Sequence, residues 1–126
     1  MIHSVYLIHE SGICLFVRTY RKDTTDVDLL SGYLLSISQF AKQMMGDAVR
    51  EIRLEKQTIV YDLQETIMFA IVTSGRKPSK RTITEILIKL NRAFMDMYGE
   101  HLQQQIIEPD LFGEFGEAVD QIIRNY

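Results

Sequence analysis

Residues 67–73 (IMFAIVT) form an almost continuous apolar run that is bounded by turn residues on its N-terminal side. The run is far shorter than the ~20 residues that a transmembrane helix needs. Short, uninterrupted apolar runs of this kind are typical of a strand that is buried on both faces of a sheet. The sequence therefore predicts a central strand here, with both faces of its sheet covered.

Four further segments are predicted strands. Residues 2–9 and 13–20 are rich in β-formers and are joined by Glu10-Ser11-Gly12, which predicts a β-hairpin. Residues 48–55 alternate in polarity, and a tight turn separates them from a strand over residues 58–63. The 48–55 strand is the most charged, so we expect it at an edge, where charge discourages pairing with other chains.

A first helix is predicted over residues 27–44, with a capping box at Thr25-x-x-Asp28 and a C-cap at Gly46. Gly32 lies within it, which indicates a close backbone approach by either the sheet beneath or a partner helix. Met44 and Met45 mark either an adaptable binding surface or fillers of gaps in the core, and the second interpretation is favoured. The core-facing stripe is assigned to Val27, Leu30, Leu34, Ile37, Phe40, Ala41 and Met44.

A second helix is predicted from a capping box at Thr82-x-x-Glu85, with Gly99 interrupting it near its end. A third is predicted to start at Asp110 and to run to Ile123. The element order is then β-β-α-β-β-β-α-α. This predicts a single domain over residues 1–126 of mixed α/β (α+β) class, with a five-stranded, antiparallel-rich sheet.

The formal net charge is −3, from 14 Lys and Arg against 17 Asp and Glu. This balance argues against a dedicated nucleic-acid binder, which usually carries a strong positive field. The charges are segregated: residues 76–92 carry six cations and one acid, and residues 93–126 carry seven acids and one arginine. The basic segment is either a solvated loop and helix start or a docking patch for an acidic partner or an anionic membrane. Its candidate residues are Arg76, Lys77, Lys80 and Arg81.

No motif points to catalysis, a cofactor or a metal site. Walker A, G-x-S-x-G, H-E-x-x-H and C-x-x-C patterns are all absent. His3 and His9 lie roughly 20 Å apart along one strand, too far to share a metal, and are interpreted as surface or edge histidines. Cys14 is expected to be a small buried hydrophobe in a reducing compartment. We therefore expect a non-enzymatic protein without cofactor, located in the cytoplasm.

The chain resembles a longin domain. The resemblance rests on the IHSVYLIHESGICLFVRTY hairpin, the DLLSGYLLSISQFA helix, the IMFAIVTS strand leading into TEILIKLNRAFMDMY, and the FGEFGEAVDQII helix. The longin family implies one helix on one face of the sheet and two on the other. It also implies a non-catalytic module of vesicle-trafficking proteins, one that pairs with another longin or binds a small GTPase, with peripheral contact to membranes. Stand-alone longins also occur in archaea with eukaryote-like small GTPases, and the roadblock family is a close relative.

The resemblance places residues 13–20 and 49–55 at the two sheet edges. We expect a homodimer or a heterodimer with another longin or roadblock protein, formed through the second of these edges and the first helix. A proline at Ile52 is then expected to leave a folded monomer. The alternative is a profilin- or PAS-like domain that senses a small molecule, for which Ser36, Thr58 and Thr73 are the polar core candidates. The predicted partner-binding residues are Gly32, Gln39, Gln43, Arg50, Glu51, Ile52, Arg53 and Glu55.

Overall fold

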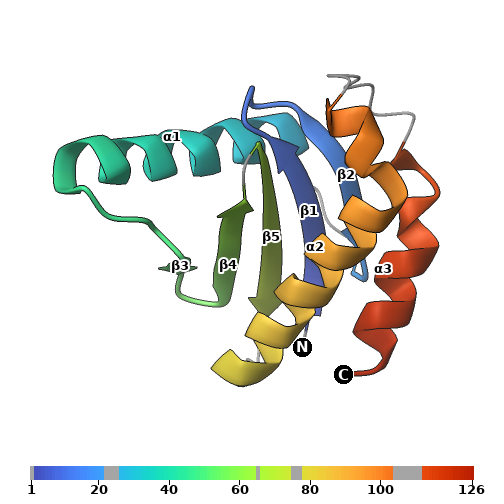
Figure 1. Cartoon of the computed structure of the whole chain (residues 1–126). Coiled ribbons are helices and arrows are strands. Elements are labelled where there is room, and N and C mark those ends of the chain that lie inside the picture. Colours follow the sequence, from blue (N-terminus) through green and yellow to red (C-terminus); the bar gives the residue numbers. More distant parts are fainter. Residues whose placement is uncertain (1, 22–25, 65, 75–77, 104–111) are drawn as a thin grey trace.

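Five strands form one antiparallel sheet in the order β2-β1-β5-β4-β3 (Figure 1). The computed structural model describes residues 2–21, 26–64, 66–74, 78–103 and 112–126, and of residues 101–103 only the backbone. The strands are β1 (Ile2–His9), β2 (Cys14–Thr19), β3 (Glu51–Arg53), β4 (Gln57–Gln64) and β5 (Ile67–Ser74). The predicted edge strands are confirmed, because β2 and β3 each pair with only one neighbour.

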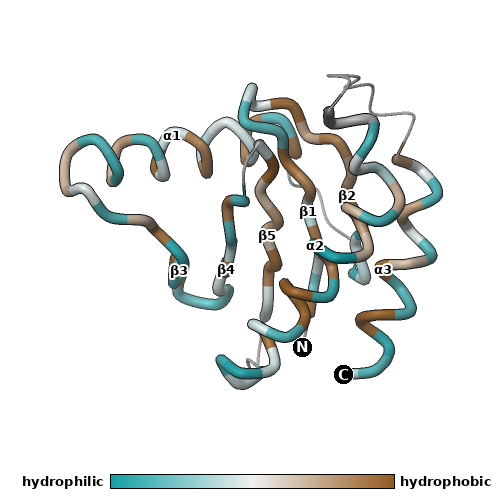
Figure 2. The backbone as a smooth tube through the Cα atoms, in the orientation of Figure 1, coloured by the Kyte–Doolittle hydropathy of each residue, from teal (hydrophilic) through white to brown (hydrophobic). Residues whose placement is uncertain are grey.

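The central strand is β5, as the apolar run predicts. All eight of its residues are buried, and so are all eight of β1, its neighbour. Figure 2 shows β5 as mostly hydrophobic, whereas the turn between β3 and β4 is hydrophilic. Burial on both faces explains why neither strand shows the alternation that a half-exposed strand would have.

One helix covers one face of the sheet and two cover the other, as the longin resemblance implies (Figure 1). Helix α1 (Val27–Met45) packs through Leu34 and Leu35 on Tyr6, Ile8 and Met68. Helices α2 (Lys80–Gln103) and α3 (Phe115–Arg124) cover the opposite face.

The core beneath α2 and α3 is built around Phe94. Its ring centroid lies 5.9 Å from that of Phe69, 5.3 Å from Tyr98, and 5.5 Å from both Phe112 and Phe115. Several of these pairs are edge-to-face, the arrangement that aromatic quadrupoles favour. The cluster ties the end of the chain to the sheet.

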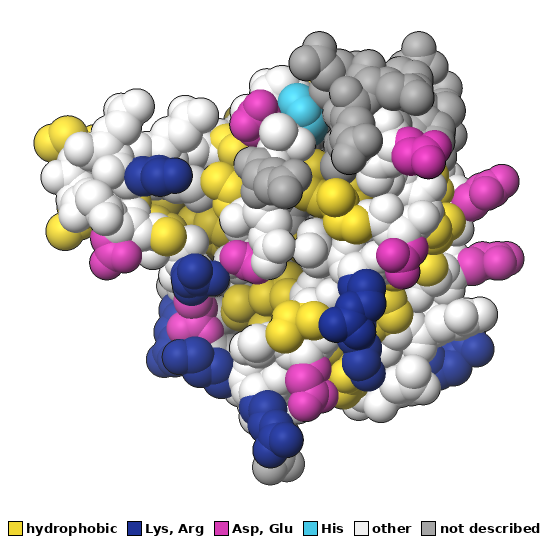
Figure 3. Space-filling model, viewed as in Figure 1, with side chains coloured by type: hydrophobic (Ala, Val, Ile, Leu, Met, Phe, Trp, Pro, Cys, Tyr) yellow, Lys and Arg dark blue, Asp and Glu magenta, His cyan; other side chains and the backbone are white. Residues whose placement is uncertain are grey.

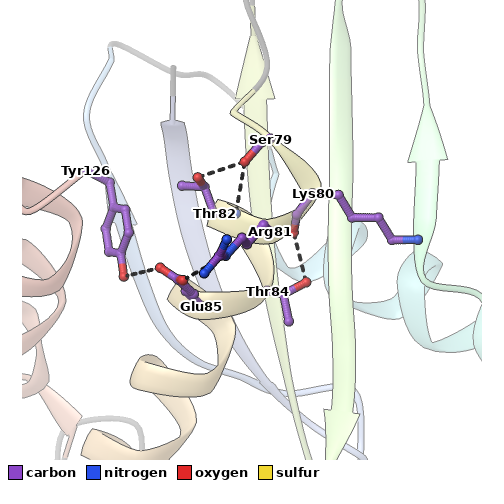
Figure 4. A network of polar contacts seen from close by, with 7 residues as sticks. All are labelled: Ser79, Lys80, Arg81, Thr82, Thr84, Glu85 and Tyr126. Atoms are coloured by element: carbon purple, nitrogen blue, oxygen red, sulfur yellow. Dashed lines mark hydrogen bonds and ion pairs between the residues drawn. The ribbon is translucent and has the colours of Figure 1, made fainter.

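The helix boundaries correct three details of the sequence prediction. Asp26 caps α1 by accepting a hydrogen bond from the Leu29 N–H at 3.1 Å, while Thr25 lies outside the described residues. Ser79, not Thr82, caps α2: its hydroxyl accepts from the Thr82 N–H at 3.1 Å (Figure 4). Ser79 and Thr82 are both residue types that favour the N-cap, and only the backbone geometry shows which of the two precedes the first turn of α2.

Helix α2 runs through Gly99 to Gln103, so the predicted interruption is wrong. The predicted start of the third helix at Asp110 lies outside the described residues, and α3 begins at Phe115. The C-cap prediction is confirmed, because Gly46 is left-handed at φ 65° and its N–H donates to the Lys42 carbonyl.

The two N-terminal histidines are buried, not at the surface as predicted. His9 closes the β1–β2 turn: its Nδ1 accepts from the Ser11 N–H at 3.1 Å and lies 2.8 Å from the Ser11 hydroxyl. His3 Nδ1 lies 3.2 Å from the Ser4 hydroxyl. The Nδ1 atom of each ring thus has a partner within two residues, which lowers the cost of burying it.

Candidate protein-interaction site

Helix α1 exposes a row of large apolar side chains on the side that faces away from the sheet. Leu29, Tyr33, Phe40 and Met44 each expose 65–69% of their surface. Successive helical residues are rotated by about 100°, so spacings of four, seven and four keep these side chains within one narrow sector. We call this row, with Gly32 and Ile37 beside it, the outer face of α1.

The opposite side of the same helix is buried against the sheet through Leu34 and Leu35. A surface helix of a globular protein normally has one apolar side and one polar side. Helix α1 has two apolar sides, which is the pattern of a helix that is covered on both. Exposed apolar surface of this extent is typical of a binding site.

The sequence analysis placed Phe40 and Met44 in the core-facing stripe, and this was wrong. Phe40 lies six positions after Leu34, which corresponds to a net rotation of about 240° around the helix axis. The two side chains therefore cannot both face the sheet. Met44 and Met45 were interpreted as core fillers, and they are 69% and 80% exposed. A second stripe at Leu29 and Tyr33 was the sequence signal that could have identified the outer face.

A shallow groove runs along the outer face, lined by Asp28, Leu29, Gly32, Tyr33, Ser36, Ile37 and Phe40. A Cβ placed on Gly32 would meet nothing within 4 Å, so the sheet is not what approaches this glycine. Of the two interpretations of Gly32, a partner helix is therefore favoured. Ser36 is exposed in this groove and does not point into the core. Gln39 and Gln43 are exposed beside it.

The C-terminal half of α1 extends past the edge of the sheet (Figure 1). From Gln39 to Gly46 every residue is exposed except the half-buried Ala41. The end of α1 therefore lies beyond the closely packed part of the sheet.

Strand β3 is shorter than predicted, spanning Glu51–Arg53 instead of residues 48–55. Its register pairs Ile52 with Ile59. The N–H of Leu54 donates to the Gln57 carbonyl, and that of Tyr61 to the Arg50 carbonyl. Hydrogen-bonded pairs alternate in an antiparallel ladder, so Ile52 bonds inward to Ile59.

This register directs the backbone N–H and C=O groups of Glu51 and Arg53 away from β4. The proposed Ile52→Pro test is therefore aimed at the wrong residue, because it removes a bond within the β3–β4 hairpin. The Glu51 carboxylate accepts from Arg53 Nε at 3.0 Å, and Arg50 Nη1 lies 3.2 Å from Asp62. Glu55 is exposed in the turn that follows.

A second groove, of about 360 Å³, lies between the end of α1 and β4 and is lined by Ser38, Lys42, Tyr61 and Leu63 among others. The hydroxyls of Ser38 and Tyr61 are buried beside this groove. Burial raises the pKa of the Tyr61 hydroxyl, and hydrogen bonding to Ser38 opposes that rise. Of the predicted polar core candidates, Thr73 is buried and donates to the Thr58 carbonyl at 3.4 Å.

The basic candidates separate into two groups. Arg76 and Lys77 lie outside the described residues. Lys80 and Arg81 are exposed in the first turn of α2, where Arg81 Nε lies 3.6 Å from Glu85 Oε1 (Figure 4). The Glu85 carboxylate also accepts from the Tyr126 hydroxyl at 3.2 Å.

The described residues contain no group of three or more His, Cys, Asp or Glu side chains placed to hold a metal ion. None of the helices that the structure describes has the length and hydropathy needed to span a membrane.

The fold has counterparts among solved structures, although no protein-family model and no curated protein sequence matches the chain. A Roadblock/LC7 domain from Streptomyces avermitilis matches with a TM-score of 0.59 at 16% identity, over 75% of this chain and 83% of that domain. The gliding protein MglB from Thermus thermophilus matches with a TM-score of 0.54 at 15% identity, over 61% of this chain and 64% of MglB.

An MglB with a tetrameric arrangement matches with a TM-score of 0.50 at 17% identity, over 58% of this chain and 60% of that one. The chain thus spans less than two thirds of the length of these two MglB structures. At such identities the likeness concerns the fold alone. The antiparallel five-stranded sheet and the helices on its two faces give this chain a roadblock/longin-like fold, as the sequence resemblance implies.

Proposed function

We propose that this protein is a non-catalytic interaction module of the roadblock/longin type, which dimerises and presents α1 to a small GTPase. The observation that carries the proposal is the two-sided α1: one apolar side packs on the sheet and the other is open to solvent beside a free strand edge. Such a helix packs on the sheet with one apolar side and offers the other apolar side to a binding partner.

The dimer uses the β3 edge. Two copies related by a two-fold axis at Ile52 would place Glu51 of each opposite Arg53 of the other. Both residues direct their backbone N–H and C=O groups outward, so the two strands would form a continuous antiparallel ladder. Each carboxylate would also meet a guanidinium of the second copy, which fixes the register. The overhanging end of α1 would gain cover from the second copy.

A proline at Arg53 tests the dimer. The Arg53 N–H points outward, so the substitution removes a bond between copies and none within the hairpin. We expect wild type to sediment as a dimer and Arg53→Pro as a monomer with unchanged circular dichroism. Ile52→Pro is the matched comparison, because it breaks the hairpin itself. A dimer that persists in folded Arg53→Pro would contradict this arrangement.

The outer face of α1 is assigned to the GTPase. The longin and roadblock resemblance supports a GTPase as partner, and the exposed Leu29, Tyr33 and Phe40 supply the apolar contact area. Membrane-trafficking-like regulation, a cytoplasmic location and a heterodimer with another longin follow the same resemblance. Peripheral membrane contact through Arg76, Lys77, Lys80 and Arg81 belongs to this proposal as well.

The test is a pull-down of the small GTPases of the source organism, loaded with GDP or a GTP analogue. We expect nucleotide-dependent binding to wild type and none to the double variant Tyr33→Glu/Phe40→Glu. Lys42→Gln, on the same helix but away from the outer face, should bind like wild type. Undiminished binding by the double variant would exclude the outer face as the docking site.

A second candidate function is small-molecule sensing, in the manner of profilin- or PAS-like sheets. The observation in its favour is the pair of buried hydroxyls of Ser38 and Tyr61 beside the groove under α1. A polar ligand group entering that groove would hydrogen-bond to them. Thermal-shift screening of a metabolite library against wild type and Tyr61→Phe tests this candidate, and stabilisation of wild type alone would favour it.

A further inference from the structure

A groove on the α2 face of the molecule combines an apolar floor with a cationic rim. It has a volume of about 370 Å³ and lies between the N-terminal half of α2 and the β3–β4 hairpin. Val60, Leu87 and the half-exposed Ile88 supply apolar surface. Figure 3 shows hydrophobic side chains on this face with Lys and Arg on either side. We call it the basic groove, and its cations are Arg50, Arg53 and Lys80.

The cations of the basic groove are not neutralised equally. Arg50 and Arg53 are exposed, and each has a half-buried carboxylate partner, Asp62 and Glu51 respectively. Exposed ion pairs of this type contribute little to stability, so their partners can be exchanged. Lys80 has no carboxylate partner among the described residues, and its side chain extends from α2 across β4 toward β3 (Figure 4). The groove therefore suits a partner surface that is acidic and partly apolar.

This chain itself carries such a surface at the other end of α2. Met97, Glu114, Glu117 and Gln121 line a shallow depression where α2 meets the start of α3, and no Lys or Arg lines it. Both glutamates are exposed, as is Met97, and neither glutamate has a cationic partner among the described residues. We call this the acidic surface.

We propose that a second copy of this chain docks its acidic surface on the basic groove. Lys80 and Met97 lie 17 residues apart on one straight helix, a rise of ~25 Å, so the two surfaces cannot meet within a single copy. Contact between two different surfaces is heterologous, and it continues to a third copy unless the ring closes. This assembly is separate from the two-fold dimer proposed above, which ends at two copies.

Charge reversal at the two surfaces tests the assembly. We expect the weight-average mass of wild type in sedimentation to exceed two copies at ~0.02 M salt and to fall as salt is raised to ~0.5 M, because salt screens charge pairs between copies. Lys80→Glu and Glu117→Lys should each weaken this association at least tenfold. An equimolar mixture of the two variants should restore it, since each reversed residue then meets its opposite charge.

Arg92→Glu is the matched control, with the same change of charge on the same helix outside the basic groove, and it should associate like wild type. A mass independent of salt would overturn the proposal, as would failure of the mixture to restore association. Binding of wild type to phosphatidylserine vesicles through Lys80, without self-association, would also overturn it, because the occupant would then be a membrane. The test still holds if the two-fold dimer does not form. The salt-dependent rise in weight-average mass is then measured from one copy instead of two.

Discussion

Arg18 and Asp120 lie 102 residues apart in the sequence and form a bidentate ion pair that fastens edge strand β2 to α3. Arg18 Nε donates to Asp120 Oδ1 at 3.0 Å, and the Tyr20 hydroxyl donates to the same oxygen at 2.7 Å. The guanidinium lies over the first turn of α3, where a Cβ on Gly116 would come within 3.3 Å of Arg18 Nη1. A side chain at position 116 would therefore displace the Arg18 guanidinium.

Removing the Asp120 charge should weaken this fastening in a pH-dependent way. Hydrogen bonding to Arg18 holds the pKa of Asp120 below its ordinary value. A carboxyl with a depressed folded-state pKa stabilises the protein above its unfolded pKa and loses that contribution as pH falls through the folded value. We expect Asp120→Asn to lower the free energy of unfolding by about 1 kcal/mol at pH 7. Urea unfolding at several pH values should show the two proteins converging as the pH falls below the ordinary range of an aspartate.

The cap of α2 gives a second prediction. Ser79→Ala removes the acceptor for the Thr82 N–H and should destabilise the protein by about 1 kcal/mol. Thr82→Ala leaves that acceptor in place and should have a smaller effect. Thermal unfolding of both variants measures the difference, and an equal or larger loss in Thr82→Ala would place the cap at the position that the sequence pattern suggested.

Truncation of two phenylalanines should destabilise the protein to very different extents. Phe94 is fully buried within the aromatic cluster, so Phe94→Ala should cost about 3–5 kcal/mol. Phe40 is 65% exposed, so Phe40→Ala should change the unfolding free energy by less than about 0.5 kcal/mol in dilute protein. Urea unfolding of both variants at the same protein concentration measures the difference, and a loss above about 2 kcal/mol in Phe40→Ala would contradict the exposure of this ring.

The thiol of Cys14 should react slowly in the folded protein. Burial raises the pKa of the Cys14 thiol, and its Sγ lies 3.3 Å from the Phe16 carbonyl oxygen to which it donates. The thiolate is the reactive form, so labelling by a disulfide reagent at pH 8 should be at least ~10-fold slower than in urea-unfolded protein. The native rate should still be rising above about pH 9. Labelling at the unfolded rate would show that the thiol is accessible and unperturbed.

Strands β1 and β5 were predictable because a strand that is buried on both faces has a continuous apolar run of residues. The order of elements followed from the sequence pattern, the edge position of β3 from its charge, and that of β2 from the longin resemblance. The length of β3 did not, because the alternation over residues 48–55 continues past the point where pairing with β4 ends. The residues of β3 whose backbone N–H and C=O groups point away from β4 are set by the hydrogen-bond register of the two strands. The sequence of β3 alone does not determine that register.

The outer face of α1 was missed for a different physical reason. Periodicity shows which residues share a side of a helix, but two apolar sides give two valid stripes. Leu34 and Phe40 belong to different stripes, and only the packed sheet identifies the one that is buried. Partner surfaces are the places where the rule that apolar residues face the core fails in a single chain.

The overhang of α1 makes the end of this helix a reporter of complex formation. From Gln39 to Gly46 only Ala41 is half-buried, so side-chain packing contributes little to the last turns of α1. Short helical segments without such support are marginal in water. In the isolated protein, amide hydrogen exchange should therefore quicken steadily from Leu34 toward Met45. A protein that binds over these turns would slow that exchange without altering the rates in β5. The gradient of amide protection along α1 would thus distinguish the bound protein from the isolated one.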